Sequence, residues 1–373
     1  MRILQLVAGE KWTGAAAVVF DQTAALVAAG VEAQFGFVGQ SPLARRLLPL
    51  GWARPLLSGP RGLLDYPGDV RNLRQTVERE GFEIVHCHLS HDHYLAAAAL
   101  RGKRALLART FHHLDHVRSD VFSRMLFRRT DGFAFANRAI ADEFGAPGPV
   151  HSPVVDAERF HPGEKPLRRC AALGIPDRSF VVGTVGKLAA GRGHQVTIET
   201  LARLPADAVL LHVGKGELQP ELASRAAALG VAARNFWTGY VEDELPDLYR
   251  AMDVFLFTAS GKEQGQRALL EAMASGVPIV ALDLPGVGDL VAHEREGLLV
   301  GRAEDLAPAL ERLRNDPENR REMAGRARAR SLELGAEPFA RRAREFYARL
   351  LSGVCLSNLS GGPCGPPNPL GIR

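Results

Sequence analysis

The sequence predicts an α/β protein made of two doubly wound domains, each a parallel sheet with helices on both faces. Short apolar runs alternate with helical stretches, which is the pattern of parallel strands joined by crossover helices. The alternation breaks once, over 145–178, where Pro and Gly are frequent, and then restarts. A chain of 373 residues is also too long for one ordinary core. These three observations together favour two domains of similar size.

The first half contains five expected strands. They are residues 3–8, 31–38, 83–87, 104–110 and 132–136. The expected helices are 15–29, 68–80, 92–101 and 119–129. Gly30 ends the first of these helices, because glycine is favoured just beyond a helix C-terminus.

The second half repeats the pattern. Its expected strands are 180–186, 208–214, 236–239, 254–259, 277–283 and 297–300. Two of its expected helices begin at His194 and at Gln219. The other expected helices cover 243–252, 266–275, about 303–334 and 337–351. The first predicted domain comprises residues 1–164 and the C-terminal helix 337–352, which returns to it. The second predicted domain comprises residues 165–336. A tail over 353–373 follows, and its Gly and Pro content predicts disorder. Ligands of such sheets bind at the carboxyl ends of strands, so a central cleft that the two domains face is the expected site.

The charge of the chain limits its partners. The net charge is +4, and residues 41–130 hold 15 Lys and Arg against 8 Asp and Glu. A basic region of this kind favours a phosphorylated substrate or an anionic membrane surface. No nucleic-acid-binding signature accompanies it, so we expect no nucleic acid partner. The sequence has no apolar run of membrane-spanning length, and its start lacks the features of a signal peptide. We therefore expect a cytoplasmic protein, which the basic region could also place peripherally at the inner face of the membrane.

The stretch over 262–283 is rich in potential chemistry. It places Glu263 and Glu271 around a glycine loop that follows a strand and opens a helix. The free N–H groups of a helix N-terminus suit a phosphate, and a carboxylate can accept hydrogen bonds from two neighbouring sugar hydroxyls. The alternative is that Glu271 only complements a helix dipole and that Glu263 is a solvated loop residue.

A second stretch, over 183–200, places two cations beside a helix N-terminus. Lys187 and Arg192 flank a short loop between a strand and a helix. Two cations in this position can clamp a diphosphate through charge-assisted hydrogen bonds. The alternative is two solvated surface cations.

Taken together, these stretches resemble the retaining glycosyltransferases of family four, which have the two-domain GT-B fold. The resemblance covers the chain up to about residue 351. The matching segments are GEKWTGAAAV with Gly14, RTFHH with His112, PVVDAERFHP (153–162), GKLAAGRG with Lys187 and Arg192, VGKG (213–216) and EQGQRALLEAMA (263–274). The set is more specific than any one of its members.

The resemblance implies a role for each of these positions. Lys187 and Arg192 would hold the donor diphosphate, and His112 would sit over the reacting sugar. Glu263 would contact the hydroxyls of the sugar, and Glu271 those of the ribose. The other donor-side residues that the resemblance implies are Gly14, Gly186, Gly214, Gly216, Gly265, Gln266 and Arg267.

This sequence departs from the family pattern at three places. The first glycine of the N-terminal pair is Thr13, and the usual Arg is Lys187, which keeps the charge but loses the bidentate fork. The usual G-F-G is Gln264-Gly265-Gln266, so the sugar specificity of the family does not carry over. Every charged role is still filled, and we expect an active enzyme.

The resemblance therefore implies a metal-independent retaining glycosyltransferase that needs no cofactor. It would move a sugar from a nucleotide-diphosphate donor to a hydroxyl of a glycan or glycolipid acceptor, in cell-envelope glycan synthesis such as that of lipopolysaccharide. Two alternatives stay open. One is a metal-dependent hydrolase that uses the histidines between His86 and His93, and the other is a catalytically silent protein that binds nucleotide sugars.

The histidines in IVHCHLSHDHY (84–94) have the spacing of some metallo-hydrolases. Ser90 stands where those enzymes place an aspartate, so one ligand is missing. We interpret His86 as a packed histidine at a strand end. His88, His91 and His93 are instead candidates for the acceptor side of the cleft.

The segment over 119–130 has the composition of an interfacial helix. Its apolar residues lie largely on one side, and Arg124, Arg128 and Arg129 add positive charge, which suits an anionic membrane surface. The alternative is an ordinary amphipathic helix that packs its apolar side on the sheet.

Overall fold

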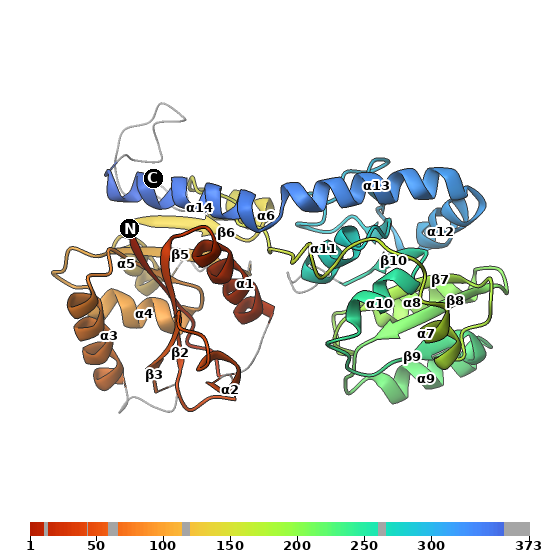
Figure 1. Ribbon diagram of the computed structural model, residues 1–373, viewed down its shortest axis with the longest axis horizontal. Helices are drawn as coiled ribbons and strands as arrows, with labels where there is room; N and C mark the ends of the chain where they lie inside the picture. The colour runs from red at the N-terminus through yellow and green to blue at the C-terminus, as the bar shows by residue number, and fades with distance from the viewer. Residues whose placement is uncertain (11–13, 43, 59–65, 114–119, 260–265, 354–373) are drawn as a thin grey trace. The chain divides into compact units, whose positions relative to one another are not determined.

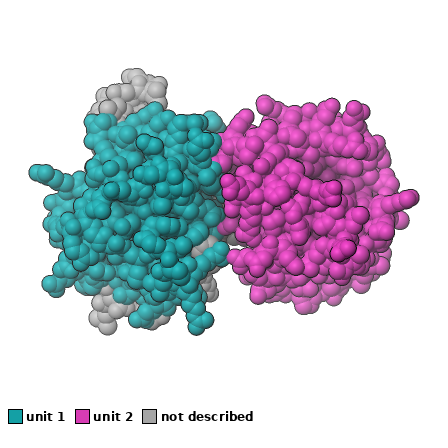
Figure 2. Space-filling model, viewed as in Figure 1, with its two compact units in different colours: residues 1–154, 336–373 teal, residues 155–335 magenta. Residues whose placement is uncertain are grey.

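The computed structural model describes residues 1–10, 14–42, 44–58, 66–113, 120–259 and 266–353. The chain forms two compact units, which Figure 2 colours separately. Unit 1 comprises Met1–Val154 and Ala336–Arg373, and unit 2 comprises Val155–Gly335. Each unit contains a six-stranded parallel sheet with helices on both faces (Figure 1). The predicted α/β class with two doubly wound sheets is confirmed.

The sheet of unit 1 has the strand order β3-β2-β1-β4-β5-β6. Its strands are β1 (Arg2–Leu6), β2 (Glu32–Val38), β3 (Ala53–Leu57), β4 (Ile84–Cys87), β5 (Leu106–Phe111) and β6 (Gly132–Phe135). The sequence analysis missed β3, which contains Pro55. Proline has no N–H for a neighbouring strand, and β3 tolerates it because this strand lies at the edge of the sheet.

Two groups of helices cover the sheet of unit 1. The helices of this unit are α1 (Gly14–Ala28), α2 (Ala44–Leu47), α3 (Tyr66–Glu80), α4 (Ser90–Ala99), α5 (Val121–Phe127), α6 (Arg138–Phe144) and α14 (Ala336–Leu351). Strand alternation decides which face each side chain takes. Ile3 and Ile84 pack against α1 and α14, whereas Leu4 and Val85 pack against α3 and α4. Helix α14, the last of the described helices, therefore completes the core of the first unit.

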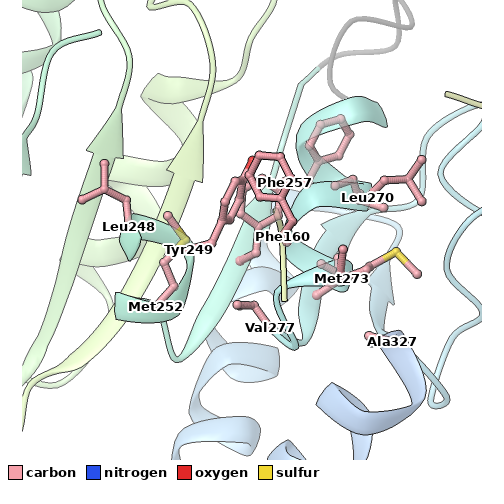
Figure 3. Close-up of a cluster of buried hydrophobic side chains, with 14 of the residues drawn as sticks. Phe160, Leu248, Tyr249, Met252, Phe257, Leu270, Met273, Val277 and Ala327 are labelled. Atoms are coloured by element: carbon pink, nitrogen blue, oxygen red, sulfur yellow. The ribbon is translucent and has the colours of Figure 1, made fainter. Parts of the chain in front are cut away.

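The sheet of unit 2 has the order β12-β11-β10-β7-β8-β9. Its strands are β7 (Phe180–Val185), β8 (Ala208–Val213), β9 (Asn235–Trp237), β10 (Val254–Phe257), β11 (Ile279–Leu282) and β12 (Gly297–Val300). Its α-helices are α7 (Leu167–Ala172), α8 (His194–Ala202), α9 (Gln219–Ala228), α10 (Leu245–Ala251), α11 (Gln266–Ala274), α12 (Leu306–Asn315) and α13 (Pro317–Glu333). Figure 3 shows part of the core, where Phe160, Tyr249 and Met273 gather. The single helical stretch expected over 303–334 is divided, because Pro317 starts a new helix that Asp316 caps by accepting a hydrogen bond from the N–H of Asn319.

The boundary between the units differs from the predicted one at residue 164. The structure divides the chain after Val154, because Val155 and Phe160 are buried in the core of unit 2. The Nη1 of Arg328 also donates to the carbonyl of Phe160 (2.9 Å). The second boundary lies at Ala336, one residue before the predicted one, and the tail from residue 354 onward lies outside the described residues. A search of the described helices finds none with the length and apolarity needed to cross a membrane.

Candidate functional site

The loops that follow β7 and β8 meet at the carboxyl edge of the unit 2 sheet. The two strands pair in parallel, so both loops leave the sheet at the same edge. The Gly186 N–H donates to the carbonyl of Val213 (2.9 Å), and the Leu188 N–H donates to that of Lys215 (3.1 Å). These bonds hold the backbone on both sides of Lys187 in place.

The glycines of the VGKG segment allow this close backbone approach. Gly214 has a φ of 140°, and a Cβ on it would lie 1.9 Å from the carbonyl oxygen of Gly186. A Cβ on Gly216 would lie 2.1 Å from the carbonyl oxygen of Leu188. Packing within the protein is therefore sufficient to require both glycines. Direct contact of Gly186, Gly214 or Gly216 with a donor stays a prediction.

Lys187 and Arg192 lie in the loop between β7 and α8, as the sequence analysis expected. The Nζ of Lys187 forms an ion pair with the Glu217 carboxylate (3.1 Å), and both side chains are 61% exposed. Arg192 is half-buried and precedes Gly193, whose carbonyl accepts a hydrogen bond from the Thr258 hydroxyl (3.0 Å). Thr258 follows β10, so this bond ties the Arg192 loop to the strand that leads to α11. The sequence analysis did not single out Thr258, because an isolated Thr at a strand end carries no signal.

Glu271 is buried on α11, and its carboxylate is oriented by two side chains. The Tyr249 hydroxyl donates to Oε2 (2.9 Å), and the Nε of Arg267 donates to Oε1 (3.0 Å). Burial raises the pKa of Glu271, while the positive charge of Arg267 and the two hydrogen bonds lower it. Each carboxylate oxygen has a second lone pair, so both can accept a further hydrogen bond. The sequence analysis missed Tyr249, because its position in α10 reads as part of the apolar face.

Gln266 begins α11 with a buried amide that lacks a partner. Its side chain is 4% exposed, and the Nε2 makes no hydrogen bond within the part of the chain that the structure describes. The first turn of α11, whose backbone N–H groups have no acceptor within the helix itself, lies at the same place. A buried donor without a partner beside a helix N-terminus suits the oxygens of a phosphate or a sugar. Glu263 and Gly265, which the sequence analysis places next to it, lie outside the described residues.

In unit 1 the structure brings together two of the predicted residues. His88 follows β4 and His112 follows β5, and the Nδ1 of His88 lies 3.0 Å from the Nε2 of His112. Both rings are buried, with 1% and 3% exposure. Gly14, another predicted residue of this unit, begins α1 in the connection that follows β1.

Of the other histidines of the cluster, only His86 lies against this pair, with its ring stacked on that of His88 at a centroid distance of 4.6 Å. His86 is a buried strand-end histidine, as interpreted from the sequence. His93 points inward from α4, with its Nε2 2.9 Å from the Thr130 hydroxyl, whereas His91 is half-buried beside the ring of Tyr66. Strand alternation and the inner face of α4 bury His88 and His93, and a role of His88, His91 or His93 on the acceptor side stays a prediction. Across the described ranges, no group of three or more His, Cys, Asp or Glu side chains could hold a metal ion.

A buried ion pair supports the opposite face of the same sheet. Asp92 on α4 lies 3.5 Å from the Arg109 guanidinium on β5, and the exposure of both is 1% or less. The Asp92 carboxylate also accepts hydrogen bonds from the backbone N–H groups of His88 (3.2 Å) and Leu89 (2.8 Å). Burial raises the pKa of Asp92 to about 7, against the opposing effects of Arg109 and of these N–H groups. The sequence analysis gave no sign of this pair.

Comparison with known proteins identifies related sequences for both units. Residues 179–316 match the family model described as glycosyl transferases group 1, and residues 12–151 match that of glycosyltransferase family 4. D-inositol 3-phosphate glycosyltransferase of Rhodococcus opacus is 35% identical over 181 residues, which are 45% of this chain and 40% of that protein. The lipopolysaccharide core biosynthesis mannosyltransferase LpsB of Rhizobium meliloti is 30% identical over 50% of this chain and 55% of its own length. The chain thus spans about half the length of the curated relatives it matches.

Among solved structures, Anabaena HepE in complex with UDP has a similar fold. It superposes with a TM-score of 0.81 at 21% identity and covers 93% of this chain and 100% of its own. At this identity the similarity concerns the fold alone.

Proposed function

Because this chain belongs to the group 1, family 4 glycosyltransferases and has their GT-B fold, we propose that it transfers a sugar from a nucleotide-diphosphate donor to an acceptor hydroxyl. One observation carries the proposal most strongly. The start of α11 presents the buried, unpartnered amide of Gln266 at the same sheet edge as Lys187 and Arg192. An edge with two cations, a helix N-terminus and the Nε2 donor of Gln266 suits a diphosphate.

The donor would be held by residues with different chemistry. Lys187 and Arg192 would neutralise the diphosphate, and the Gln266 amide would meet the distal phosphate or the sugar. Glu271 would accept hydrogen bonds from the ribose hydroxyls, because Tyr249 and Arg267 hold its carboxylate in one orientation. This arrangement needs no metal ion, since fixed cations supply the positive charge.

In the proposed reaction the bond between the sugar C1 and the leaving phosphate oxygen breaks, and a bond from C1 to the acceptor oxygen forms on the same face. The acceptor proton goes to the leaving phosphate oxygen, so the products are a nucleoside diphosphate and a glycoside with retained configuration. The two cations stabilise the charge that develops on the phosphate, which is where preorganised electrostatics contribute most. His112 would lie over the reacting sugar.

The hydrolase alternative finds no support in the positions of the histidines. The ring nitrogens of His86 and His88 are all engaged in hydrogen bonds with protein side chains, and His91 lies on a different element from either. A silent nucleotide-sugar-binding protein would share the same edge of the unit 2 sheet. It would bind the donor but would neither transfer nor hydrolyse it.

The first test is the thermal stability of the full chain, with a chelator present, in UDP, GDP, ADP and CMP. HepE has been solved with UDP and with UDP-glucose, which makes UDP the first probe. A ligand at about 100 times its dissociation constant stabilises a protein by about 2.7 kcal/mol, which is visible as a melting shift. We expect one diphosphate to give this shift and Glu271→Ala to remove it.

Two further variants make this result specific. Glu271→Gln keeps the shape of the side chain and tests the charge alone, while Glu221→Ala removes an exposed glutamate of the same unit and should leave the shift unchanged. Absence of a shift with every nucleotide would contradict the proposed donor site. A shift without transfer or slow donor hydrolysis would favour the silent protein.

The acceptor is proposed to be a cell-envelope glycolipid or another anionic glycan. The relatives named above are described as acting on inositol phosphate and in lipopolysaccharide core synthesis, so they differ in acceptor. What supports an anionic acceptor here is the basic character of residues 41–130. A cytoplasmic location with contact to the inner membrane face is part of the same proposal.

Helix α5 has the surface that such membrane contact would need. Leu126 and Phe127 pack inward, but Val121, Phe122 and Met125 are 73%, 74% and 55% exposed. Arg124 on this helix and Arg128 and Arg129 directly after it are also exposed. Arg129, just after this helix, lines a pocket of about 300 Å³ together with three cations of the connection between α4 and β5, namely Arg101, Lys103 and Arg104. Exposed apolar side chains among cations favour an anionic bilayer surface.

Vesicle binding tests this contact. We expect the protein to sediment with phosphatidylglycerol vesicles and not with phosphatidylcholine vesicles, and the triple change Arg124→Glu, Arg128→Glu and Arg129→Glu to abolish binding. The matched control replaces three exposed arginines of unit 2 by Glu, namely Arg168, Arg203 and Arg321. This control variant should still bind the vesicles. Equal loss in both triple variants would show a nonspecific charge effect, and unchanged binding in the α5 variant would contradict the proposal.

A further inference from the structure

Six buried polar side chains of unit 1 form one continuous chain of hydrogen bonds. The chain runs Thr110–His86–Tyr347–Gln5–His88–His112, with separations of 2.8, 2.7, 2.8, 2.8 and 3.0 Å in that order. None of the six is more than 3% exposed. Bulk water therefore does not reach these groups, and each depends on its neighbours for hydrogen bonds.

Strand alternation places this chain on the face of the sheet that α1 and α14 cover. On β1, Gln5 follows Ile3 on that face, and His86 follows Ile84 in the same way on β4. Toward the carboxyl edge, the apolar core thus gives way to a polar row that ends at His112. Tyr347 on α14 joins the two halves of the row, although it lies 261 residues from His86 in the sequence.

The Gln5 amide sets the direction of every bond in the chain. Its oxygen faces His88 and its NH₂ group faces Tyr347. His88 must then carry its proton on Nε2, so its Nδ1 accepts a hydrogen bond from the Nε2–H of His112. On the other side, the Tyr347 hydroxyl accepts from Gln5 and donates to the Nδ1 of His86, whose Nε2–H donates to Thr110.

Both central histidines are neutral, so each carries one ring proton and has a defined tautomer. Burial lowers the pKa of His86 and of His88 well below the usual value, and nearby positive charge lowers it further. The titratable and charged side chains that act on them from neighbouring elements are His93, Arg109, His112 and His151. The opposite orientation of the Gln5 amide would reverse all five bonds and move the proton of His112 to Nδ1.

We propose that Gln5, His88 and Tyr347 are positioning residues that hold His112 in the tautomer with its proton on Nε2. The proposal rests on the proposed function, in which His112 lies over the reacting sugar. In this tautomer the Nε2–H of His112 is engaged by His88, which gives the ring one defined orientation. Through Tyr347, helix α14 thus contributes to the chemistry without touching the substrate.

The tautomer of His112 can be measured directly by ¹⁵N NMR of the full chain labelled at histidine, with the His112 signals assigned by their loss in His112→Gln. We expect the pattern of an Nε2-protonated ring in the wild-type protein, without any donor. Tyr347→Phe removes the hydroxyl between Gln5 and His86, so the amide can rotate and both tautomers of His112 should become populated. We expect kcat to fall roughly tenfold with little change in the donor KM, and the pH dependence of kcat to shift.

Gln5→Met breaks the chain at a second point and should have the same effects, which keeps the test informative if Tyr347→Phe folds poorly. Thr23→Val is the matched control, because it removes one buried hydroxyl hydrogen bond of the same unit, to the carbonyl of Val19 (2.6 Å), outside the chain. It should lower stability and leave the tautomer and pH profile unchanged.

Two outcomes would overturn the proposal. One is an Nδ1-protonated His112 in the wild-type protein, and the other is a tautomer and pH profile that Tyr347→Phe and Gln5→Met leave unaltered. Failure of the proposed function has a different signature. In that case the NMR pattern and its response to Tyr347→Phe would be as expected, while no nucleotide sugar was turned over.

Discussion

Acidification below pH 6.5 is expected to unfold unit 1 before unit 2. Four buried histidines of unit 1 have lowered pKa values. One of them is His151, and its burial lowers its pKa to about 3. The other three are His86, His88 and His93. In the unfolded chain these rings bind protons below about pH 6.5, while in the folded unit they stay neutral. Stability therefore falls as the pH falls, by about 1.4 kcal/mol per histidine and pH unit.

Buried carboxyl groups act in the opposite direction. The pKa of Asp92 is raised to about 7 in the folded unit, so between about pH 7 and pH 4 the folded state binds this proton more tightly and gains stability as the pH falls. This leaves about three uncompensated protons in unit 1, or about 4 kcal/mol for each pH unit. In unit 2, His194 and His212 have lowered pKa values and the raised pKa of Glu271 opposes them, so the stability of this unit should depend less on pH than that of unit 1.

Urea unfolding at pH 7.5, 6.5 and 5.5, followed by circular dichroism and by limited proteolysis, checks this prediction. At pH 5.5 we expect two separated transitions, with cleavage sites of unit 1 appearing first. His151→Leu removes one titrating group among Phe339 and Phe346 and should flatten the pH dependence of unit 1 by about a third, whereas His161→Asn, at an exposed position, should not. A transition midpoint that is constant from pH 7.5 to 5.5 would contradict the neutral buried histidines.

Replacing Lys187 with alanine is expected to lower the kcat of sugar transfer by about 100- to 1,000-fold, which is the effect of removing one preorganised charge-stabilising group from an active site. The charge on the leaving phosphate grows toward the transition state, so the loss should fall mainly on kcat and less on the donor KM. The Nζ of Lys187 is now paired with Glu217 at 3.1 Å. A diphosphate at this edge would compete with Glu217 for the ammonium group.

Two variants make the Lys187 result specific. Lys187→Arg keeps the charge and adds a bidentate fork, so it should retain activity. Lys165→Ala removes another ion-paired lysine of unit 2 and should leave kcat within a few-fold of wild type. The partner of Lys165, Asp253, also accepts a hydrogen bond from the N–H of Val181 in β7. Equal activity of Lys187→Ala and Lys165→Ala would remove Lys187 from the proposed donor site.

Local patterns in the sequence were sufficient for most of the fold. Apolar runs of strand length between helical stretches predicted both sheets, because burial on both faces leaves a direct trace in composition. The same patterns placed Lys187 and Arg192 between β7 and α8, and Glu271 on α11. They failed at β3, where an edge position makes a proline acceptable, and at the unit boundary, where Val155 and Phe160 belong to the second core.

The sequence by itself determined the two doubly wound sheets, the connections that carry the candidate donor residues and the family resemblance, since all of these depend on periodicity and on short motifs. The tertiary structure alone decided which side chains meet. Strand alternation and the return of α14 to unit 1 put the Tyr347 hydroxyl 2.7 Å from the Nδ1 of His86. In unit 2, the packing of α10 beside α11 puts the Tyr249 hydroxyl 2.9 Å from the Glu271 carboxylate. Hydrogen bonds between residues so far apart in the chain depend on the packing of elements, which no local pattern encodes. For the same reason, four histidines that look like one site in the sequence divide in the fold: His86 and His88 share one chain of hydrogen bonds, while His91 and His93 contact Tyr66 and Thr130.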